Sequence, residues 1–378
     1  MLNQLKDKST LIKVLNSTFM ELPAPKNISF SWNLGSLLFL CLILQIMTGV
    51  LLASSYSPNT ESSFYMIILS MENINKNWLV RYIHTNGASL FFICLYYHMS
   101  RNIYYYSYLY MHTWFTGVTI FILTMATAFL GYVLPINQMS YWGASVITNL
   151  LSEVPYIGPN LIELVWGSPS VNSPTIMRFF SFHFMLPFLI AAFSIIHITL
   201  LHETGSKNPL GMKSINNKYM FSPIFIFKDL LGYMVVMFLF MLITMLLPLA
   251  LGDDENFFNY NPYVTPIHIQ PEWYFLFAYA ILRSIPNKMG GIVALMASIF
   301  ILYFLPYLHM SNMASPYYPI NKIIFFMFII DVSLLTWIGM SPVEVPYIFV
   351  GQILSVMYFA YYLFSPLLNY QWEKFIFL

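Results

Sequence analysis

Charged residues are scarce in this chain. Only 8% of its 378 residues are Asp, Glu, Lys or Arg, whereas 58% are hydrophobic. Soluble domains carry about 25% charged residues, so this chain lacks the polar surface that a water-soluble protein needs. A net charge of +1 without a basic cluster in the sequence also argues against a nucleic-acid partner.

Cysteine is nearly absent as well. The two cysteines, Cys41 and Cys94, lie inside apolar runs, where we interpret them as small packing residues. Neither begins the C-x-x-C-H motif that attaches haem covalently. A haem in this protein would therefore be held without thioether links.

Long apolar runs, in contrast, fill most of the chain and predict an all-α, polytopic membrane protein. We expect eight transmembrane helices, at residues 33–53, 78–104, 113–134, 175–201, 229–251, 288–308, 320–341 and 346–368. An even number of spans places both termini on the same side of the membrane.

The basic residues of the short loops indicate which side that is, because Lys and Arg concentrate on the inner side. With the termini inside, the eleven inner basic residues are Lys6, Lys8, Lys13, Lys26, Arg101, Lys207, Lys213, Lys218, Lys228, Lys322 and Lys374. The five outer ones are Lys76, Arg81, Arg178, Arg283 and Lys288. This asymmetry favours two inner termini.

Two of the predicted outer connections are unusually long. Residues 135–174 contain amphipathic stretches that predict short helices lying at the membrane interface. Residues 252–287 run from an acidic segment through several prolines to PEWYFLFAYAILRSIP. Long patterned loops are often functional, and apolar interfacial ones indicate a site for a lipid-soluble ligand.

Two pairs of histidines share one spacing inside predicted spans. His84 and His98 are fourteen residues apart, and so are His183 and His197. Fourteen residues of helix rise about 21 Å and turn about 40° short of four full turns, so both members of a pair share one helix face. A lone histidine on an apolar face is usually a core residue, but ionisable groups within spans are rare and functional by default. We therefore predict that His84 faces His183 and that His98 faces His197, each couple holding one of two stacked, six-coordinate haem irons.

Glycines and arginines support this prediction. In the first and third spans, Gly35 with Gly49 and Gly117 with Gly131 repeat the fourteen-residue period. Glycine lets a backbone approach a flat ring closely, although small-residue helix packing also explains it. Arg81 lies one turn before His84 and Arg101 one turn after His98, where they could bind haem propionates or snorkel to lipid.

The whole chain resembles cytochrome b, the membrane core of the cytochrome bc1 complex (respiratory complex III), in its mitochondrial form. The stretches that carry the resemblance are NLGSLLFLCLILQIMTGVLLA, RYIHTNGASLFFICLYYHMSRN, GYVLPINQMSYWGASVITNLLS, RFFSFHFMLPF, LHETGSKNPLG, PEWYFLFAYAILRSIPNK and TWIG. PEWY together with the histidine spacing is highly specific to that family.

This resemblance implies a fold, a location and partners. The first four spans would form a four-helix bundle around two non-covalent b-type haems, in a domain of residues 1–205, followed by a C-terminal four-helix domain of residues 206–378. The protein would lie in the mitochondrial inner membrane with both termini on the matrix side. Its partners would be a Rieske iron–sulfur protein, cytochrome c1, other complex III subunits, the lipid bilayer and a second copy of itself.

The resemblance also implies the activity of a quinol–cytochrome c oxidoreductase. Ubiquinol is oxidised at an outer site, one electron goes to the iron–sulfur protein, and the other passes through the outer haem (His84/His183) to the inner haem (His98/His197). It then reduces ubiquinone at an inner site, and the cycle is coupled to proton translocation.

By the same resemblance, Glu272 of the PEWY motif accepts a proton at the outer site, where an apolar pocket would raise the pKa of its carboxyl. Other positions match residues that line the outer pocket: Phe129, Tyr132, Gly143, Ile147, Pro271, Tyr274 and Tyr279. At the inner site, His202 and Asp229 match residues that hydrogen-bond and protonate quinone. Further matches to cofactor- or quinone-contacting positions are Ser36, Ser206 and Lys228.

One departure lies beside the outer pocket. The family usually has PWGQMS where this chain has Pro135-Ile136-Asn137-Gln138-Met139-Ser140, so a tryptophan and a glycine are missing. Asparagine tolerates positive φ better than most residues, so we expect the turn to survive and the pocket to remain competent.

Two alternatives stay open at this point. A haem-free transporter could use intramembrane histidines as a proton relay, but this does not explain the repeated spacing or the matching glycines. The second alternative is a bacterial plasma-membrane homologue. Against it stands a composition rich in Phe, Tyr, Met and Ile, which suits an AT-rich organellar genome.

Overall fold

The structure is a computed structural model that describes residues 13, 16, 20–212, 214 and 216–377. Of the residues used above to predict the orientation, Lys6, Lys8 and Lys213 lie outside the described residues.

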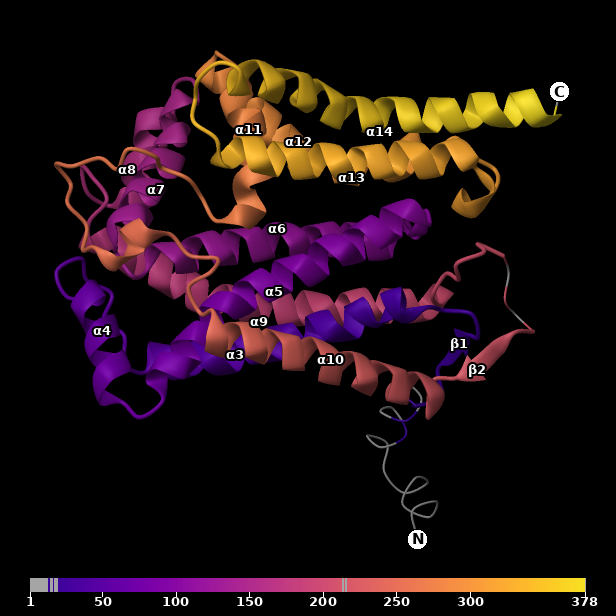
Figure 1. Ribbon diagram of the computed structural model, residues 1–378, viewed down its shortest axis with the longest axis horizontal. Coiled ribbons are helices and arrows are strands. Elements are labelled where there is room, and N and C mark those ends of the chain that lie inside the picture. The colour runs from indigo at the N-terminus through magenta and orange to yellow at the C-terminus, as the bar shows by residue number, and fades with distance from the viewer. Residues whose placement is uncertain (1–12, 14–15, 17–19, 213, 215, 378) are drawn as a thin grey trace, which may run out of the picture.

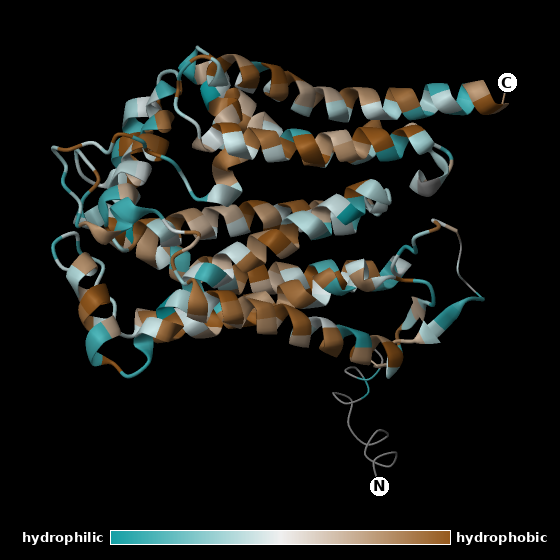
Figure 2. Cartoon of the chain, viewed as in Figure 1, coloured by the Kyte–Doolittle hydropathy of each residue, from teal (hydrophilic) through white to brown (hydrophobic). Residues whose placement is uncertain are grey.

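Long helices that run side by side form the body of the molecule (Figure 1). They are α3 (Leu34–Ala53), α5 (Asn77–Tyr104), α6 (Met111–Val133), α9 (Ser173–Thr204), α10 (Ile224–Leu246), α12 (Lys288–Leu308), α13 (Pro319–Met340) and α14 (Tyr347–Phe377). Hydrophobic residues cover their length, whereas hydrophilic residues gather at the two ends of the bundle (Figure 2). The all-α membrane fold predicted from the sequence is confirmed.

Among the described residues, seven of these helices are long and apolar enough to cross a membrane, and α5 is the exception. At 28 residues α5 is long enough, about 42 Å, but polar side chains interrupt its apolar surface. Two of them, Asn86 and Ser89, are buried between helices rather than facing outward. Asn86 donates to the carbonyl oxygen of Pro248 (3.0 Å), so these polar groups are satisfied inside the protein.

Two helices depart from their predicted bounds by five residues or more. The fifth span was expected at residues 229–251, but α10 begins at Ile224, directly after Pro223, and ends at Leu246, just before Pro248. Proline is tolerated at a helix start, where its missing N–H is not needed, and it disfavours the helical conformation of the residue before it, which is consistent with helix bounds set by Pro223 and Pro248. The last helix, α14, continues to Phe377, beyond the expected end at residue 368.

Short elements distinguish the two ends of the bundle (Figure 1). At one, which we call the helical-loop end, lie α4 (Ser63–Asn73), α7 (Gln138–Asn149), η4 (Leu150–Glu153), α8 (Gly158–Trp166), η5 (Asp254–Phe257), η6 (Trp273–Phe275) and α11 (Leu276–Ser284). At the other, the strand end, lie β1 (Pro23–Pro25), β2 (Lys218–Met220), η2 (Phe30–Asn33), η3 (Ser107–Leu109) and η7 (Ser315–Tyr317). Strands β1 and β2 pair antiparallel. Helices α7 and α8 confirm the amphipathic helices predicted in residues 135–174, whereas α4 was not predicted.

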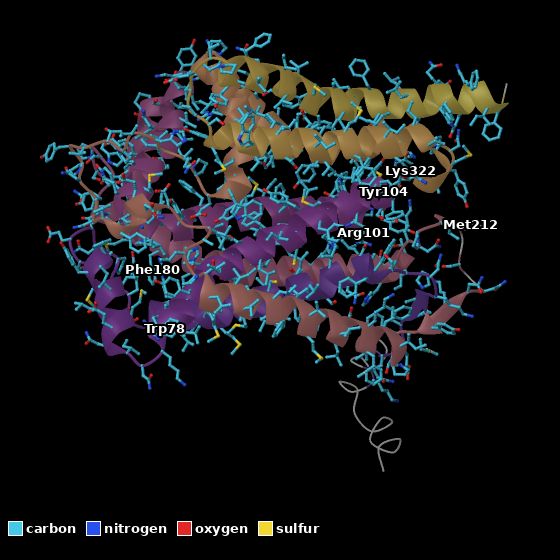
Figure 3. The ribbon with its side chains drawn as sticks, in the orientation of Figure 1. Trp78, Arg101, Tyr104, Phe180, Met212 and Lys322 are labelled. Carbon is cyan, nitrogen blue, oxygen red and sulfur yellow. The ribbon has the colours of Figure 1, made fainter. Side chains whose placement is uncertain are left out.

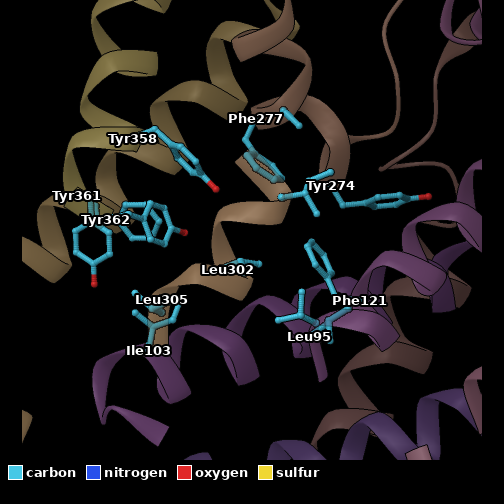
Figure 4. Close-up of a cluster of buried hydrophobic side chains, with 14 of the residues drawn as sticks. Leu95, Ile103, Phe121, Tyr274, Phe277, Leu302, Leu305, Tyr358, Tyr361 and Tyr362 are labelled. Carbon is cyan, nitrogen blue, oxygen red and sulfur yellow. The ribbon is translucent and has the colours of Figure 1, made fainter. Parts of the chain in front are cut away.

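The largest cluster of buried hydrophobic side chains joins α5 and α6 to the helices of the C-terminal half, α11 to α14 (Figure 4). Tyr274 belongs to it, and its ring stacks on Phe92 of α5 with centroids 4.0 Å apart and planes 3° from parallel. Trp273 donates to the hydroxyl of Ser89 (3.0 Å). The PEWY segment is therefore anchored on the helix that carries His84 and His98.

Candidate functional site

The structure brings the four histidines together in the two predicted couples. Helix α3 packs on α5 and α6 packs on α9, so that α5 and α9 present their histidines to a common interior. The ring centroids of His84 and His183 are 6.3 Å apart, and those of His98 and His197 are 6.5 Å apart. Two imidazole nitrogens that each lie about 2 Å from one metal ion place their ring centres about 6 Å apart. Both couples therefore have the separation that a shared metal ion requires.

Hydrogen bonds fix the tautomer of three of these histidines. His183 Nδ1 lies 2.7 Å from the carbonyl oxygen of Thr127, which can only accept. His84 Nδ1 lies 2.8 Å from Thr48 Oγ1, whose own proton is donated to the carbonyl of Leu44 (2.7 Å). Since Nδ1 carries the proton in both rings, Nε2 keeps a free lone pair, as a metal-ligating imidazole needs.

His98 and His197, the couple nearer the strand end, repeat this arrangement only in part. His197 Nδ1 lies 3.1 Å from Thr116 Oγ1, and that hydroxyl donates to the carbonyl of Thr113 (2.9 Å). Within the described part of the chain, His98 Nδ1 is buried without a hydrogen-bond partner. The two couples thus share their separation but differ in how their rings are held.

Each of the four periodic glycines faces one histidine ring. A Cβ atom placed on Gly35 would lie 3.7 Å from His98 Cε1, one on Gly49 3.2 Å from His84 Cε1, and one on Gly117 3.0 Å from His197 Cε1. At Gly131 it would overlap the ring of His183. The glycines therefore make room for the imidazoles themselves, which refines the sequence interpretation that they give clearance to a cofactor.

A cavity of about 510 Å³ surrounds the His84–His183 couple. Its lining includes both of these histidines, Gly49, Gly131 and Arg81. Ligand pockets usually enclose about 300–1,000 Å³, so this one has room for a large, mostly apolar ligand. Arg81 supplies a cation for an acidic substituent.

Arg101 is the corresponding cation nearer the strand end (Figure 3). Its guanidinium lies 4.8 Å from the ring centre of Trp32, and its Nε is buried and finds no hydrogen-bond partner in the residues that the structure describes. A buried, incompletely bonded guanidinium favours an anionic group beside it.

A second, narrower pocket lies at the helical-loop end. Seven of the residues assigned to the outer quinone site line it: Phe129, Tyr132, Gly143, Ile147, Pro271, Glu272 and Tyr279. Tyr274, the eighth, instead lines the histidine cavity. The hydroxyl of Tyr279 donates to the carbonyl of Ile269 (3.1 Å), which ties α11 to the loop before it.

Glu272 and Tyr132 line both this pocket and the histidine cavity, so they form the wall between them. Burial, followed by the nearby Asp253 carboxylate, raises the pKa of Glu272 to about 7. The side chain of Gln270 donates to Asp253 (3.2 Å) and holds that carboxylate in place. Glu272 can therefore gain and lose a proton near neutral pH.

The turn before α7 forms although Ile136-Asn137 stands where the family usually has Trp-Gly. Its backbone conformation differs from the predicted one. The residue with positive φ is Ile136 (φ 47°), whereas Asn137 is extended (φ −84°) and caps α7. Asn137 Oδ1 accepts from the backbone of Ser140 (2.9 Å), and Ser140 Oγ accepts from the backbone of Asn137 (2.8 Å). The expectation that Asn137 would take the left-handed conformation is wrong. Ile136 is fully buried and takes it instead, at a cost on the order of 1–3 kcal/mol.

The residues assigned to the inner quinone site lie at the strand end, on two neighbouring segments. His202 and Ser206 lie at the end of α9 and in the loop after it, and Lys228 and Asp229 lie in the first turns of α10. Ser36 lies beside the carboxylate of Asp229. The side chain of Asn33 donates to the carbonyl of Lys228 (2.7 Å), and Trp32 Nε1 donates to that of Lys207 (2.8 Å).

Several residues of these sites escaped the sequence analysis. Four further residues line the narrow pocket: Val146, Ile269, Gln270 and Phe275. Thr48 and Thr116 orient histidines, and a signal for them was present, because each directly precedes a periodic glycine. No sequence pattern marked Trp32 and Lys207 as residues near the inner quinone site.

These features define a class: a multi-pass helical membrane protein whose interior holds two histidine couples at two depths. The family model described as Cytochrome b/b6/petB matches residues 19–205, and the one described as Cytochrome b(C-terminal)/b6/petD matches residues 259–359. A solved structure titled "Hyperthermophilic respiratory Complex III" is 29% identical, with a TM-score of 0.91 over 98% of this chain and 100% of that one.

The chain belongs to the cytochrome b family. Membership implies that it binds b-type haem and serves as a di-haem electron-transfer subunit of a bc1-type complex, a quinol oxidoreductase with other subunits. Residues 206–258 and those after 359 lie outside both matched ranges.

Proposed function

We propose that this protein is the cytochrome b subunit of a ubiquinol–cytochrome c oxidoreductase. It oxidises ubiquinol in the narrow pocket at the helical-loop end and reduces ubiquinone at the strand end. The observation that carries the proposal is the wall formed by Glu272 and Tyr132 between that pocket and the histidine cavity.

The histidine couples would hold the two haems. His84 and His183 would ligate the iron nearer the helical-loop end, which we call the outer couple, and His98 and His197 the other, the inner couple. Held by two imidazoles each, the haems would supply one-electron transfer, and the four histidines would leave no place at the iron for a further ligand. Gly35, Gly49, Gly117 and Gly131 give the imidazoles room, and Arg81 and Arg101 would neutralise propionates.

At the outer site, Glu272 would receive a proton from the quinol hydroxyl. Its carboxylate form is populated at neutral pH because its pKa is about 7. Tyr132 stands next to it in the wall, and Phe129, Gly143 and Ile147 shape the apolar side of the pocket. Because this wall also borders the histidine cavity, the quinol would give its proton to Glu272 and its electron toward the outer couple at the same position.

At the inner site, His202 and Asp229 would hydrogen-bond the quinone oxygens and supply protons, with Ser36, Ser206 and Lys228 around them. Histidine suits this task because its charge changes near physiological pH. The contacts of Asn33 and Trp32 support this placement, since they join the α9 and α10 segments into one end of the bundle.

The cellular setting is also a proposal. We place the protein in the mitochondrial inner membrane, with the strand end and both termini on the matrix side, as the loop charges favour. Its partners would be a Rieske iron–sulfur protein, cytochrome c1 and a second copy of the chain. We divide it into a haem domain, residues 1–205, and a C-terminal domain, residues 206–378, a division supported by the two separate family matches.

Quinol oxidation by the purified complex, with cytochrome c as acceptor, tests this proposal. The Glu272→Gln complex should keep both b-type haem signals but lose most of its turnover. Glu163, an exposed glutamate on α8 at the same end, offers a matched control in Glu163→Gln, which should behave as wild type. A wild-type complex with normal haem spectra but no quinol oxidation would overturn the proposal.

A further inference from the structure

A buried polar cluster at the strand end has no role in the function proposed above. Its members, which we call the strand-end cluster, are Tyr106, Lys207, His309, Asn369 and Glu373. They come from the loops after α5, α9 and α12 and from the end of α14. Tyr106, Asn369 and Glu373 are 5%, 3% and 6% exposed, so their polar atoms must find partners inside the protein.

Lys207 makes contacts in two directions. Its carbonyl oxygen accepts a hydrogen bond from Trp32 Nε1 (2.8 Å), and its Nζ donates to the carbonyl oxygen of Tyr106 (2.7 Å). Lys207 directly follows Ser206, and Trp32 lies against Arg101. The lysine therefore joins the edge of the inner quinone site to the loop after α5.

Helix α14 holds Tyr106 from the other side. Asn369 Nδ2 donates to the hydroxyl of Tyr106 (2.8 Å), and the ring of His309 lies 5.0 Å from the tyrosine ring. Tyr106 has a positive φ of 54°, which a non-glycine residue keeps only where its surroundings hold it. Its position, and hence the carbonyl that Lys207 binds, depends on these contacts.

Glu373, one turn beyond Asn369, fixes the end of α14 to the loop after α12. Its carboxylate accepts from the backbone and side-chain nitrogens of Asn312 (2.6 and 2.8 Å) and from the hydroxyl of Tyr318. Charge-assisted bonds of this kind are stronger than neutral ones, so this end of α14 is a rigid support.

We propose that the end of α14 positions the Trp32–Lys207 edge of the inner quinone site, through hydrogen bonds from Asn369 to Tyr106 and from Lys207 to Tyr106. The inference rests on the proposed function, because it assumes that quinone binds at the strand end. Asn369, Tyr106 and Lys207 act as positioning residues, since each acts through another group. All three lie beside the proposed site, and their hydrogen bonds run to one another.

Variants of the assembled complex can separate this role from general packing. Asn369→Leu removes the amide at nearly constant volume, and Lys207→Met removes the ammonium but keeps the apolar stem. Lys207→Arg keeps a donor and should rescue. The matched control is Gln352→Leu, because Gln352 lies in the same helix and donates one hydrogen bond, to the carbonyl of Ser284 (3.2 Å), but at the opposite end.

The readout is photolabelling of the resting complex by a short-chain azido-quinone, quantified on peptides that contain Trp32 or Ser206 and on peptides that contain Tyr132. Asn369→Leu and Lys207→Met should raise the quinone concentration for half-maximal labelling of the strand-end peptides by about five- to tenfold, as expected for one lost buried hydrogen bond. Labelling of the Tyr132 peptides should stay as in wild type. In turnover, the KM for quinone at the inner site should rise more than kcat falls.

Two results overturn the inference, and they are distinct. If wild type labels at the strand end but Asn369→Leu matches Gln352→Leu, the positioning role is wrong and the proposed function stands. If wild-type strand-end peptides are not labelled at all, the inner quinone site itself is wrong. Should Asn369→Leu fail to assemble, Tyr106→Phe removes only the hydroxyl that accepts from Asn369 and must give the same shift.

Discussion

The two histidine couples have nearly the same ring separation, 6.3 and 6.5 Å, but different surroundings. In the outer couple both rings donate from Nδ1, to Thr48 and to the carbonyl of Thr127. In the inner couple His197 does so, to Thr116, whereas His98 Nδ1 is buried and has no partner among the described residues. The ring separation would thus set where a metal ion sits, whereas the hydrogen bonds at Nδ1 would set how electron-rich its ligands are.

This difference has a consequence for the direction of electron flow. A hydrogen bond from Nδ1 makes the imidazole a stronger electron donor, and stronger donors stabilise the oxidised form of a metal. Two such bonds at the outer couple and one at the inner couple predict the lower reduction potential at the outer site. Electrons would then move from the outer couple to the inner couple without another driving force.

Substituting the periodic glycines should produce the largest effects. In Gly131→Ala the new methyl overlaps the His183 ring, so the outer haem should be lost, whereas in Gly35→Ala it lies 3.7 Å from His98 and the inner haem should remain. Gly117→Ala and Gly49→Ala, at 3.0 and 3.2 Å from their histidines, should fall between these extremes. Haem content per complex measures the series, and equal loss in all four variants would contradict the account.

The outer site should depend on pH through Glu272. Below about pH 7 its carboxyl is protonated and cannot accept a proton, so quinol oxidation should rise as the pH increases through that value and then level off. Glu272→Gln should lower the rate by about 100-fold or more and abolish the step in the pH profile. An unchanged profile in the variant would show that another group takes the proton.

The threonines should have smaller effects that differ between the couples. Thr48→Val removes the acceptor of His84, so it should raise the potential of the outer haem, and Thr116→Val should raise that of the inner one. Each should weaken haem binding by about 10–100-fold, as is typical when a ligand loses its hydrogen-bond partner. Potentiometric titration of the two b-type signals checks this, and a shift in the other haem would count against it.

Much of the fold and of the histidine geometry was predictable from the sequence because both rest on helical periodicity. Apolar runs gave the long helices, and the fourteen-residue period of His84 with His98 placed both on one face of α5. The pairing of His84 with His183 followed because α5 and α9 cross the bundle in the same direction. The helices and their shared faces depend on local geometry, whereas the pairing also depends on the direction in which α5 and α9 run.

What the sequence did not reveal depends on contacts between distant segments. Thr48 stands directly before a periodic glycine in the sequence, but its hydrogen bond to His84 forms only because α3 lies against α5, and Trp32 meets Lys207 across 175 positions of the chain. The positive φ at Ile136 was assigned to its neighbour, because intrinsic preference favours asparagine there and the capping of α7 overrides it. Tertiary contacts decide such positions, and no periodic pattern reports them.

The central claim, that each histidine couple holds one haem, is tested most directly by counting b-type haems in His84→Ala and His98→Ala complexes. Redox difference spectra with potentiometric titration should show two haems in wild type and one in each variant. The low-potential signal should be missing in His84→Ala and the high-potential one in His98→Ala. Loss of the same signal in both variants, or retention of two haems in either, would contradict the assignment.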